Sequence, residues 1–369
     1  MGSSSEKKDI DEFFVPWVRD AKAYSSDHIT YAWKHPSTDR LMANENFHSP
    51  SKKVIKAVTD TARKGNLYPP ESSPLKERLA KLNGLEKDNV FVGNGSLEVI
   101  DVIARVFISP GDEVITPLPS YAVYGVRTKL VGGSVRTVPP LHDLTCDVNS
   151  VIKMINKKTR LIIIVSPNNP IGSIFPENDL RTILDEGVPT VVDEAYYELE
   201  DNPQSVSVLL EEYPNLIVIR TMSKAWGMAG YRIGYAFASE KIIDHLNRMR
   251  INFSISIVNM AAAIAALDDI EYFNKQNADT KKLRSELEKE LKKIKGLRVF
   301  HSSGNFILMD GEELGVKGED VVKYCLENNI QIRLMNKPEL GAGFFRITIG
   351  SREQHKRFVR TLKEFLSNK

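Results

Sequence analysis

The chain has 369 residues, of which 42% are hydrophobic and 27% charged, a composition typical of a globular protein large enough for more than one lobe. Its formal net charge of +2 gives no reason to expect binding to nucleic acid or to a membrane surface. No apolar run approaches the length of a membrane span, and the first residues lack the apolar stretch of a signal peptide. Cys146 and Cys325 are too few for a disulfide framework, so we expect a reducing, cytoplasmic location.

Residues 1–45 are predicted to form an N-terminal arm. Their pattern is irregular but rich in aromatic side chains, at Phe13, Phe14, Trp17, Tyr24, Tyr31 and Trp33. Aromatic rings bury large apolar areas. We therefore expect this arm to pack against another surface, for which a second subunit is a candidate.

Residues 46–264 are predicted to form a large domain. Apolar residues recur at helical spacing between Leu97 and Phe107 and predict a helix that stops at 109–111. Short apolar runs between helical segments predict buried strands at 114–115, 161–165, 191–192, 216–219 and 233–237. Continuous runs of this kind favour an α/β fold, in which helices cover both faces of a mainly parallel sheet.

Residues 265–369 are predicted to form a smaller α+β domain. Lys and Glu with spaced Leu and Ile over 271–295 predict a long, solvated helix with one buried stripe. The remainder alternates between strands at 297–300, 306–309, near Ile332 and at 345–349, and helices at 320–327 and 353–366. No internal repeat or low-complexity tract is evident.

A glycine-rich turn at 93–97 follows a short strand and opens a helix. Glycines let the backbone approach a phosphate closely, and the free N–H groups at a helix N-terminus bind anions. The same glycines also fit an ordinary tight turn. The motif by itself does not decide between the two.

Lys224 directly follows the region of a predicted buried strand, 216–219. A desolvated lysine loses its proton more easily, and a neutral amine attacks carbonyl groups, so Lys224 is a candidate partner of an aldehyde cofactor. Ser223 precedes it and Arg232 follows it by eight residues. These are groups that the phosphate of such a cofactor would need.

The longer pattern around Lys224 resembles the cofactor-lysine region of the fold-type I pyridoxal-phosphate-dependent aminotransferases of class I/II. Within that class it is most similar to the histidinol-phosphate aminotransferase group. The resemblance runs from about residue 40 to the C-terminus and follows an ordered set: the glycine-rich turn, Tyr121, Asn169, Asp193, Tyr196, Ser223, Lys224 and Arg232. It implies a fold-type I enzyme with a large domain that binds pyridoxal 5′-phosphate and a small C-terminal domain.

The resemblance also implies a role for each residue around the cofactor ring. Lys224 would hold the cofactor and act as acid and base, and Tyr121 would stack on the ring. Asn169 and Tyr196 would donate to the phenolic oxygen. Asp193 would pair with the pyridinium N–H, which keeps the ring able to withdraw electrons.

The cofactor phosphate would lie against the glycine-rich turn. By the resemblance, its contacts are Gly95, Ser96, Leu97, Ser223 and Arg232. The family often has an acidic residue where Leu97 stands, which matters little if the backbone N–H makes the contact. Ile171 likewise replaces a threonine of the family's Asn-Pro-Thr-Gly signature.

Several of these residues also have purely structural interpretations. Tyr124 fits a core aromatic residue at a helix start, and the Asn-Pro sequence after Asn169 forms a turn in any protein. Asp193 would also serve as a helix cap. A metal site is not expected, because no histidine or cysteine cluster accompanies Asp193.

Two arginines near the C-terminus are the candidate substrate anchors. Arg346 and Arg333 resemble the family arginines that bind a carboxylate or, in the histidinol-phosphate group, the substrate phosphate. Asn169 is expected to face the substrate as well. Surface arginines on edge strands would give the same pattern. Residues 44–49 depart from the family's Asn-Glu-Asn-Pro-x-Gly segment, and neither Tyr24 nor Tyr31 clearly matches the arm tyrosine that contacts substrate phosphate in that group.

The resemblance implies a transaminase of amino-acid biosynthesis. It would move an amino group between an amino acid or amino phosphate, similar to histidinol phosphate, and a 2-oxo acid by a ping-pong mechanism. A threonine-phosphate-like decarboxylase, or a cyclase or oxidase on the same scaffold, remains an alternative. A non-catalytic binding protein is disfavoured because both Lys224 and Asp193 are present. Tyr68 matches the family tyrosine that crosses a homodimer interface to the neighbouring phosphate, although a surface turn would also explain it.

Overall fold

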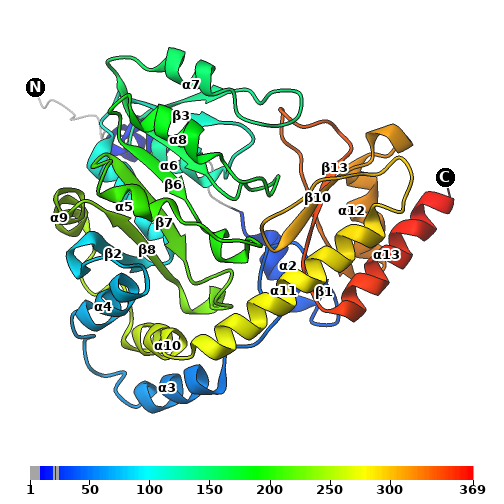
Figure 1. Cartoon of the computed structure of the whole chain (residues 1–369), viewed down its shortest axis with the longest axis horizontal. Helices are drawn as coiled ribbons and strands as arrows, with labels where there is room; N and C mark the ends of the chain where they lie inside the picture. Colours follow the sequence, from blue (N-terminus) through cyan, green and yellow to red (C-terminus); the bar gives the residue numbers. More distant parts are fainter. Residues whose placement is uncertain (1–8, 20, 22–24, 369) are drawn as a thin grey trace, which may run out of the picture.

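The computed structural model describes residues 9–19, 21 and 25–368, so Tyr24 of the predicted arm lies outside the described residues. A large lobe is built around a central sheet, and a smaller lobe beside it holds the C-terminus (Figure 1). Over the part of the chain that is described, no helix combines the length and apolar character needed to cross a bilayer.

The large sheet contains seven strands in the order β2-β8-β7-β6-β5-β3-β4. Strand β8 runs antiparallel to both of its neighbours, and the other pairs are parallel, which confirms the predicted mainly parallel sheet. The bounds are β2 Val90–Asn94, β3 Glu113–Pro117, β4 Ser134–Val138, β5 Thr159–Val165, β6 Thr190–Asp193, β7 Leu216–Thr221 and β8 Ile233–Ala238. The sequence did not predict β4, because this edge strand is mostly part-exposed and lacks a continuous apolar run.

Successive residues of the central strands feed two separate cores. Along β5, Ile162 and Ile164 pack into one apolar cluster, while Leu161 and Ile163 pack into the other, as the two-residue period of a strand requires. The first cluster includes helices α3 Lys52–Ala62, α4 Ser73–Leu82, α7 Val148–Met154, α8 Glu177–Leu184 and α10 Ile257–Leu267. The second includes α5 Ser96–Phe107, α6 Val123–Leu130 and α9 Glu240–Met249. Burial on both faces explains why the strands are uniformly apolar.

The small lobe packs an antiparallel sheet, in the order β12-β13-β10-β9, against three helices. Its strands are β9 Arg298–Val299, β10 Phe306–Asp310, β12 Arg333–Leu334 and β13 Phe344–Thr348, and its helices are α11 Ile270–Leu291, α12 Gly318–Glu327 and α13 Arg352–Ser367. The single strand predicted near Ile332 is instead two short ones. Ile332 separates β12 from β11 Ile330–Gln331, which belongs to a different sheet.

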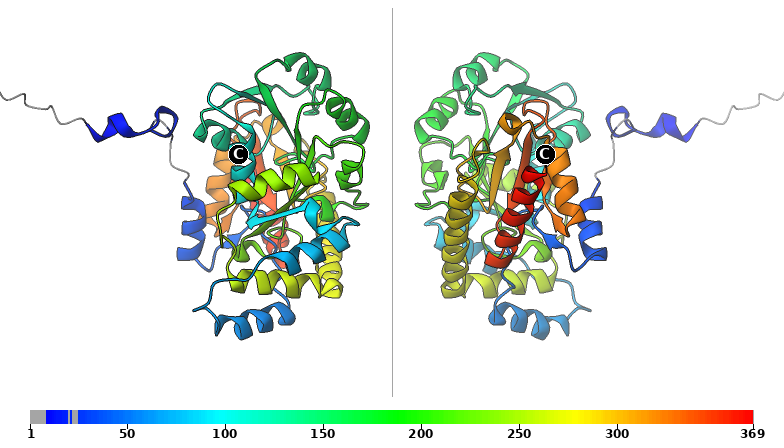
Figure 2. Two further views of the ribbon diagram at one scale, coloured as in Figure 1. Left: turned by 90° about the vertical axis from the view of Figure 1, so that its left-hand side faces the viewer. Right: turned by 90° about the vertical axis from the view of Figure 1, so that its right-hand side faces the viewer.

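The N-terminal region is more ordered than its irregular pattern suggested. Helix α2 spans Asp27–Lys34, and β1 Asp39–Arg40 pairs in parallel with β11 of the small lobe. Helix α2 is short and Ala32 is its only buried residue, so it lacks the long apolar stripe by which α11 was predicted. Farther upstream, the short helix α1 Pro16–Arg19 lies at one side of the body, next to α6 (Figure 2).

Candidate active site

Three of the predicted site residues meet at one edge of the large sheet. Asn169 follows β5, Asp193 ends β6 and Lys224 follows β7. These neighbouring strands are parallel, so their carboxyl ends lie at the same edge, where ligands of open α/β sheets bind. Arg232 is there too, directly before β8, because β8 runs in the opposite direction.

The amine of Lys224 lies against a segment that is distant in sequence. Its Nζ donates to the carbonyls of Ala43 and Asn44, each at 3.1 Å, and lies 5.7 Å from the centroid of the Tyr196 ring. Burial, followed by the positive charge of Arg346, lowers the pKa of the Lys224 amine to about 8. An amine in this state gives up its proton far more readily than free lysine, as a nucleophile or base must.

Asp193 is a buried carboxylate, only 4% exposed. The Tyr124 hydroxyl donates to its Oδ2 at 2.7 Å, and the backbone N–H of Ala195 donates to its Oδ1 at 3.0 Å. Burial raises the pKa of Asp193 to about 6, against the effect of these two hydrogen bonds. A buried carboxylate with a raised pKa is well placed to pair with a cationic ligand group, which would stabilise its ionised form.

Tyr124 thus has a contact that sequence reasoning missed. It is buried in the core as predicted for a core aromatic residue, but its hydroxyl also reaches Asp193. The ring of Tyr121 meets that of Tyr124 edge-on, with centroids 6.2 Å apart. The available signal was the three-residue spacing of the two tyrosines at a helix start.

Tyr196 is also buried, and two side-chain amides point at its hydroxyl. Asn44 Nδ2 donates to the Tyr196 oxygen at 2.9 Å and Asn169 Nδ2 at 3.4 Å. Since the oxygen accepts both bonds, its own proton is left to donate elsewhere. No acceptor for that proton is present among the residues that the structure describes.

The glycine-rich turn and Arg232 form one cradle. Gly95 has φ +77° and caps the N-terminus of α5, and a Cβ at this position would run into the guanidinium of Arg232. Arg232 donates to the hydroxyl of Ser223 at 3.4 Å. The cradle therefore combines the first N–H groups of α5, at Ser96 and Leu97, with a guanidinium and a hydroxyl, which is a suitable environment for a phosphate.

Arg346 is a buried cation with no carboxylate partner among the described residues. It is 7% exposed, and its guanidinium donates to the side-chain oxygen of Asn169 and to the carbonyl of Met42. Its Nε has no partner in the described part of the chain. Burial lowers the pKa of Arg346 to about 10. A guanidinium held in this way is suited to an anionic ligand.

Two further cations lie near Arg346. Arg333 is its directly opposed neighbour on β12 and is half-buried. Lys337 donates from its Nζ to the carbonyl of Ser120, next to Tyr121, and burial lowers the pKa of the lysine. The charge of Arg333 also lowers the pKa of His28 on α2, after the larger effect of burial. The anion-facing side of the site therefore draws on the small lobe and on the N-terminal region.

Tyr68 is the one predicted site residue that projects into solvent. It is 82% exposed, and its ring packs against Phe253 with centroids 5.0 Å apart. It lies in the connection between α3 and α4, whereas Asn169, Asp193, Lys224 and Arg232 lie at the edge of the large sheet.

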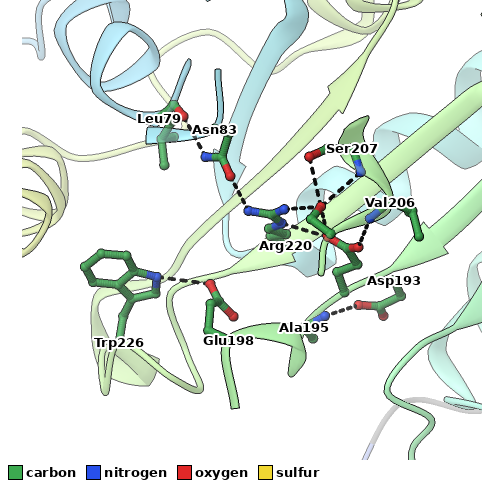
Figure 3. Close-up of polar contacts among 11 residues, drawn as sticks. Leu79, Asn83, Asp193, Ala195, Glu198, Val206, Ser207, Arg220 and Trp226 are labelled. Atoms are coloured by element: carbon green, nitrogen blue, oxygen red, sulfur yellow. Dashed lines mark hydrogen bonds and ion pairs between the residues drawn. The ribbon is translucent and has the colours of Figure 1, made fainter. Parts of the chain in front are cut away.

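A buried polar network holds the backbone around the site (Figure 3). Glu194, next to Asp193, accepts from Arg220 Nε at 2.9 Å, and Arg220 is only 1% exposed. Glu198 accepts from Trp226 Nε1 at 3.2 Å, and burial raises the pKa of Glu198 to about 7. Figure 3 shows these two contacts apart from each other. Because Trp226 lies two residues after Lys224, the Glu198–Trp226 bond links the segment after Asp193 to the segment after Lys224.

These groups fit pyridoxal phosphate. The Tyr196 hydroxyl has a proton to give to a phenolic oxygen, and Asp193 can pair with a cation such as a pyridinium. The cradle at Gly95 and Arg232 suits a phosphate, and the Lys224 amine suits an aldehyde. One ligand with these four groups would satisfy the whole set.

Comparison with known proteins identifies the family. Residues 40–362 match the model of the aminotransferase class I and II family. The chain is 36% identical over 355 residues to a histidinol-phosphate aminotransferase of Thermoanaerobacter pseudethanolicus, covering 95% of this chain and 97% of that one. It is 33% identical over 343 residues to the corresponding enzyme of Methanocaldococcus jannaschii, covering 91% of each chain.

Solved structures agree. Histidinol-phosphate aminotransferase from Sinorhizobium meliloti, in complex with pyridoxal-5′-phosphate, superposes with a TM-score of 0.87 at 25% identity and covers 96% of this chain and 98% of that one. L-threonine-O-3-phosphate decarboxylase from Porphyromonas gingivalis shares the fold, with a TM-score of 0.77 at 21% identity, covering 89% of this chain and 99% of that one. The predicted fold class, family and cofactor are confirmed, and the chain belongs to the class I and II aminotransferases as a fold-type I enzyme that uses pyridoxal 5′-phosphate.

Proposed function

We propose that this aminotransferase takes an amino group from an anionic amino donor and passes it to a 2-oxo acid in the two half reactions of a ping-pong cycle. The donor is an amino acid or an amino phosphate similar to histidinol phosphate. The observation that carries the proposal is Arg346, whose buried Nε lacks a partner among the described residues and whose charge acts on Lys224. An anion that neutralises Arg346 would bring its own amino group close to the reactive lysine.

The residues at the sheet edge would divide the work of holding the cofactor ring. Pyridoxal phosphate, when bound, supplies an electron sink that stabilises negative charge at the substrate Cα. Asp193 would hold the pyridinium N–H, and Asn169 and Tyr196 would orient the ring through its phenolic oxygen. Tyr121 would pack on the ring face. Lys224 Nζ would be the base that accepts the Cα proton, which its pKa of about 8 favours.

The phosphate and the substrate would occupy opposite ends of the site. The phosphate contacts would be Gly95, Ser96, Leu97, Ser223 and Arg232, of which Arg232 and Gly95 already touch. Arg346 would bind the anion common to all substrates, and Arg333 a second anion. The proposal includes a cofactor-binding domain over 46–264 and a small domain over 265–369.

The names of the relatives favour an amino phosphate as donor. Proteins named histidinol-phosphate aminotransferase match over about nine-tenths of the chain or more. In this chain, the three cations Arg346, Arg333 and Lys337 make the substrate side strongly positive. This charge suits a phosphate dianion or a dicarboxylate better than a neutral side chain.

Absorbance spectroscopy of the purified protein tests the proposal. We expect an amino donor alone to change the spectrum of the bound cofactor, and a 2-oxo acid added after removal of the donor to restore it, because each half reaction stands alone. Release of CO2, or failure of every 2-oxo acid to restore the spectrum, would instead support a decarboxylase, cyclase or oxidase. Arg346→Ala is the control, which should keep the cofactor bound but lose the response to donors.

We further propose a cytoplasmic homodimer in which Tyr68 of one chain reaches the phosphate cradle of the other. The exposed ring of Tyr68 packs on that of Phe253, and their sequence neighbours Leu67 and Ile251 are also more than half exposed. Exposed apolar groups of this kind are typical of a protein interface. Both cysteines are free thiols, in keeping with a reducing compartment. Analytical ultracentrifugation at assay concentration tests the dimer, and an active monomer would refute it.

A further inference from the structure

Residues 43–46 form a segment that contacts or acts on Lys224, and the proposed reaction assigns them no role. The carbonyls of Ala43 and Asn44 each accept a hydrogen bond from Lys224 Nζ at 3.1 Å. Asn46 Nδ2 donates to the backbone carbonyl of Lys224 at 3.2 Å. The carboxylate of Glu45 raises the pKa of the amine, against the larger effect of burial. All four consecutive residues therefore act on one lysine.

Asn44 also acts on a second group of the site. Its Nδ2 donates to the Tyr196 hydroxyl at 2.9 Å, a closer contact than the 3.4 Å from Asn169. With this donor in place, the Tyr196 proton must turn away from Asn44. Without it, only the longer bond from Asn169 would direct the hydroxyl.

The backbone conformation of Asn44 is what allows both contacts at once. Asn44 is 1% exposed and has φ +54°, in the left-handed region that asparagine tolerates better than most residues. In this conformation its carbonyl meets Lys224 while its side chain meets Tyr196. A single buried residue thereby connects the base of the reaction to a group that orients the cofactor.

Thr348 of strand β13 holds Asn44 in this conformation. Its Oγ1 accepts from the Asn44 backbone N–H at 2.9 Å and donates to Asn44 Oδ1 at 3.2 Å. Asn305 Nδ2 adds a bond to the Asn44 carbonyl at 3.0 Å. Thr348 lies two residues after Arg346 on the same strand, so the small lobe fixes Asn44 from the strand that carries the main substrate anchor.

We propose that Asn44 is a positioning residue, held by Thr348, which sets the direction of the Tyr196 hydroxyl and the resting place of the Lys224 amine. The inference rests on the proposed function, because it needs Tyr196 and Lys224 to act on the cofactor. It adds a route by which the small lobe controls both groups without touching the cofactor.

A double-mutant cycle between Asn44→Gly and Tyr196→Phe tests the proposal. Glycine accepts the left-handed backbone and keeps the carbonyl, so this change deletes the amide alone. We expect Asn44→Gly to shift the pH midpoint of the lysine-bound cofactor spectrum in the same direction as Tyr196→Phe. It should also lower kcat roughly ten-fold, about the effect of one lost buried hydrogen bond. On the Tyr196→Phe background, Asn44→Gly should produce little further shift in the midpoint.

Two sets of controls separate positioning from folding. Asn329 is exposed, has φ +59° and lies after α12, so Asn329→Gly repeats the same backbone change away from the site and should leave the spectrum unchanged. Thr348→Val should reproduce part of the Asn44→Gly shift, whereas Thr348→Ser, which keeps the hydroxyl, should not. The Kd of pyridoxal phosphate for the cofactor-free protein and the Tm are measured for every variant.

Two outcomes would overturn the inference. One is a fully additive cycle, in which Asn44→Gly shifts the midpoint equally with and without the Tyr196 hydroxyl. The other is a lowered Tm with no spectral shift, which would make Asn44 merely structural. If Asn44→Gly does not fold, the difference in spectral midpoint between Thr348→Val and Thr348→Ser tests the same inference. A parent protein with no lysine-bound cofactor would overturn the proposed function itself, so the two failures are distinguishable.

Discussion

The proposed cofactor side, around Asp193 and Lys224, and the proposed substrate side, around Arg346 and Arg333, are built in different ways. Asp193 ends β6 and Lys224 comes soon after β7, and the parallel pairing of these two neighbouring strands in one buried sheet brings both residues to the same edge. Arg346 and Arg333 instead lie on strands of the small lobe, and Arg346 depends on contacts to Met42 and Asn169, far away in the sequence. The first arrangement suits a permanently held cofactor. The second allows substrates to be distinguished by the positions of their charges.

The largest effect is expected from Lys224→Ala, which removes the proposed catalytic lysine. Lys224→Ala should reduce turnover by at least about 10²–10⁴-fold, the contribution typical of a lost general base, and more if the covalent attachment also matters. Some cofactor should remain bound, because the cradle at Gly95 and Arg232 does not involve the lysine. Steady-state kinetics and equilibrium dialysis with pyridoxal phosphate measure the two effects. Normal turnover in this variant would contradict the assigned role.

The next largest effect is expected from Arg346→Ala, which removes the proposed substrate anchor. Arg346→Ala should cost roughly 2–5 kcal/mol in kcat/KM for every donor, as the loss of a buried charge contact does. The cofactor should still bind, since Arg346 lies on the small-lobe strand β13 and not in the cradle, but loss of its positive charge should raise the pKa at Lys224. Kinetics with several donors check this. An effect confined to one donor would mean that Arg346 does not bind the common anion.

Arg333→Ala tests whether Arg333 and Arg346 bind different anions of the substrate. Its half-buried side chain is expected to bind a second anion, so the loss should be clear with a phosphorylated donor and small with a donor whose side chain is neutral. The ratio of kcat/KM for the two donors is the measurement. Equal losses on both donors would make Arg333 structural and remove the support for a histidinol-phosphate-like substrate.

The smallest effect concerns Tyr124. In the cofactor-free protein the pKa of Asp193 is about 6, and the Tyr124 hydrogen bond lowers it. Cofactor affinity should fall as the pH decreases through that value, because protonated Asp193 cannot pair with the pyridinium. Tyr124→Phe should raise the midpoint of this fall and weaken binding at neutral pH by about 1 kcal/mol, the typical worth of one hydrogen bond. Titration of the cofactor-free protein with pyridoxal phosphate across pH checks it, and an unmoved midpoint would argue against the role.

The sequence predicted the fold and the cofactor, and it singled out Asp193 and Lys224 as candidates, for a physical reason. Asp193 and Lys224 each follow a continuous apolar run, and a polar group at such a point is informative without any knowledge of its tertiary contacts. The strand predicted at 161–165 likewise lies within β5. Where sequence and structure differ, at β4 and α2, the elements are short or mostly exposed and lack a long apolar run or stripe.

Other parts of the site depend on contacts between distant residues. Asn44 lies 152 positions from Tyr196 and 304 from Thr348, and Tyr124 lies 69 positions from Asp193. No local pattern encodes such pairs. The Glu194–Arg220 network was missed for the same reason, because an isolated charge within an apolar strand has no visible partner in the sequence.

The pairing of β1 with β11 has a consequence for shortening the chain. A protein that began at residue 46 would retain the family motifs from the glycine-rich turn to Arg346. It would nevertheless lose both carbonyls that receive the lysine, the amide that directs Tyr196, and the Met42 oxygen that helps to anchor Arg346. Such a truncated protein would keep those motifs, but it would lack the contacts that position Lys224, Tyr196 and Arg346.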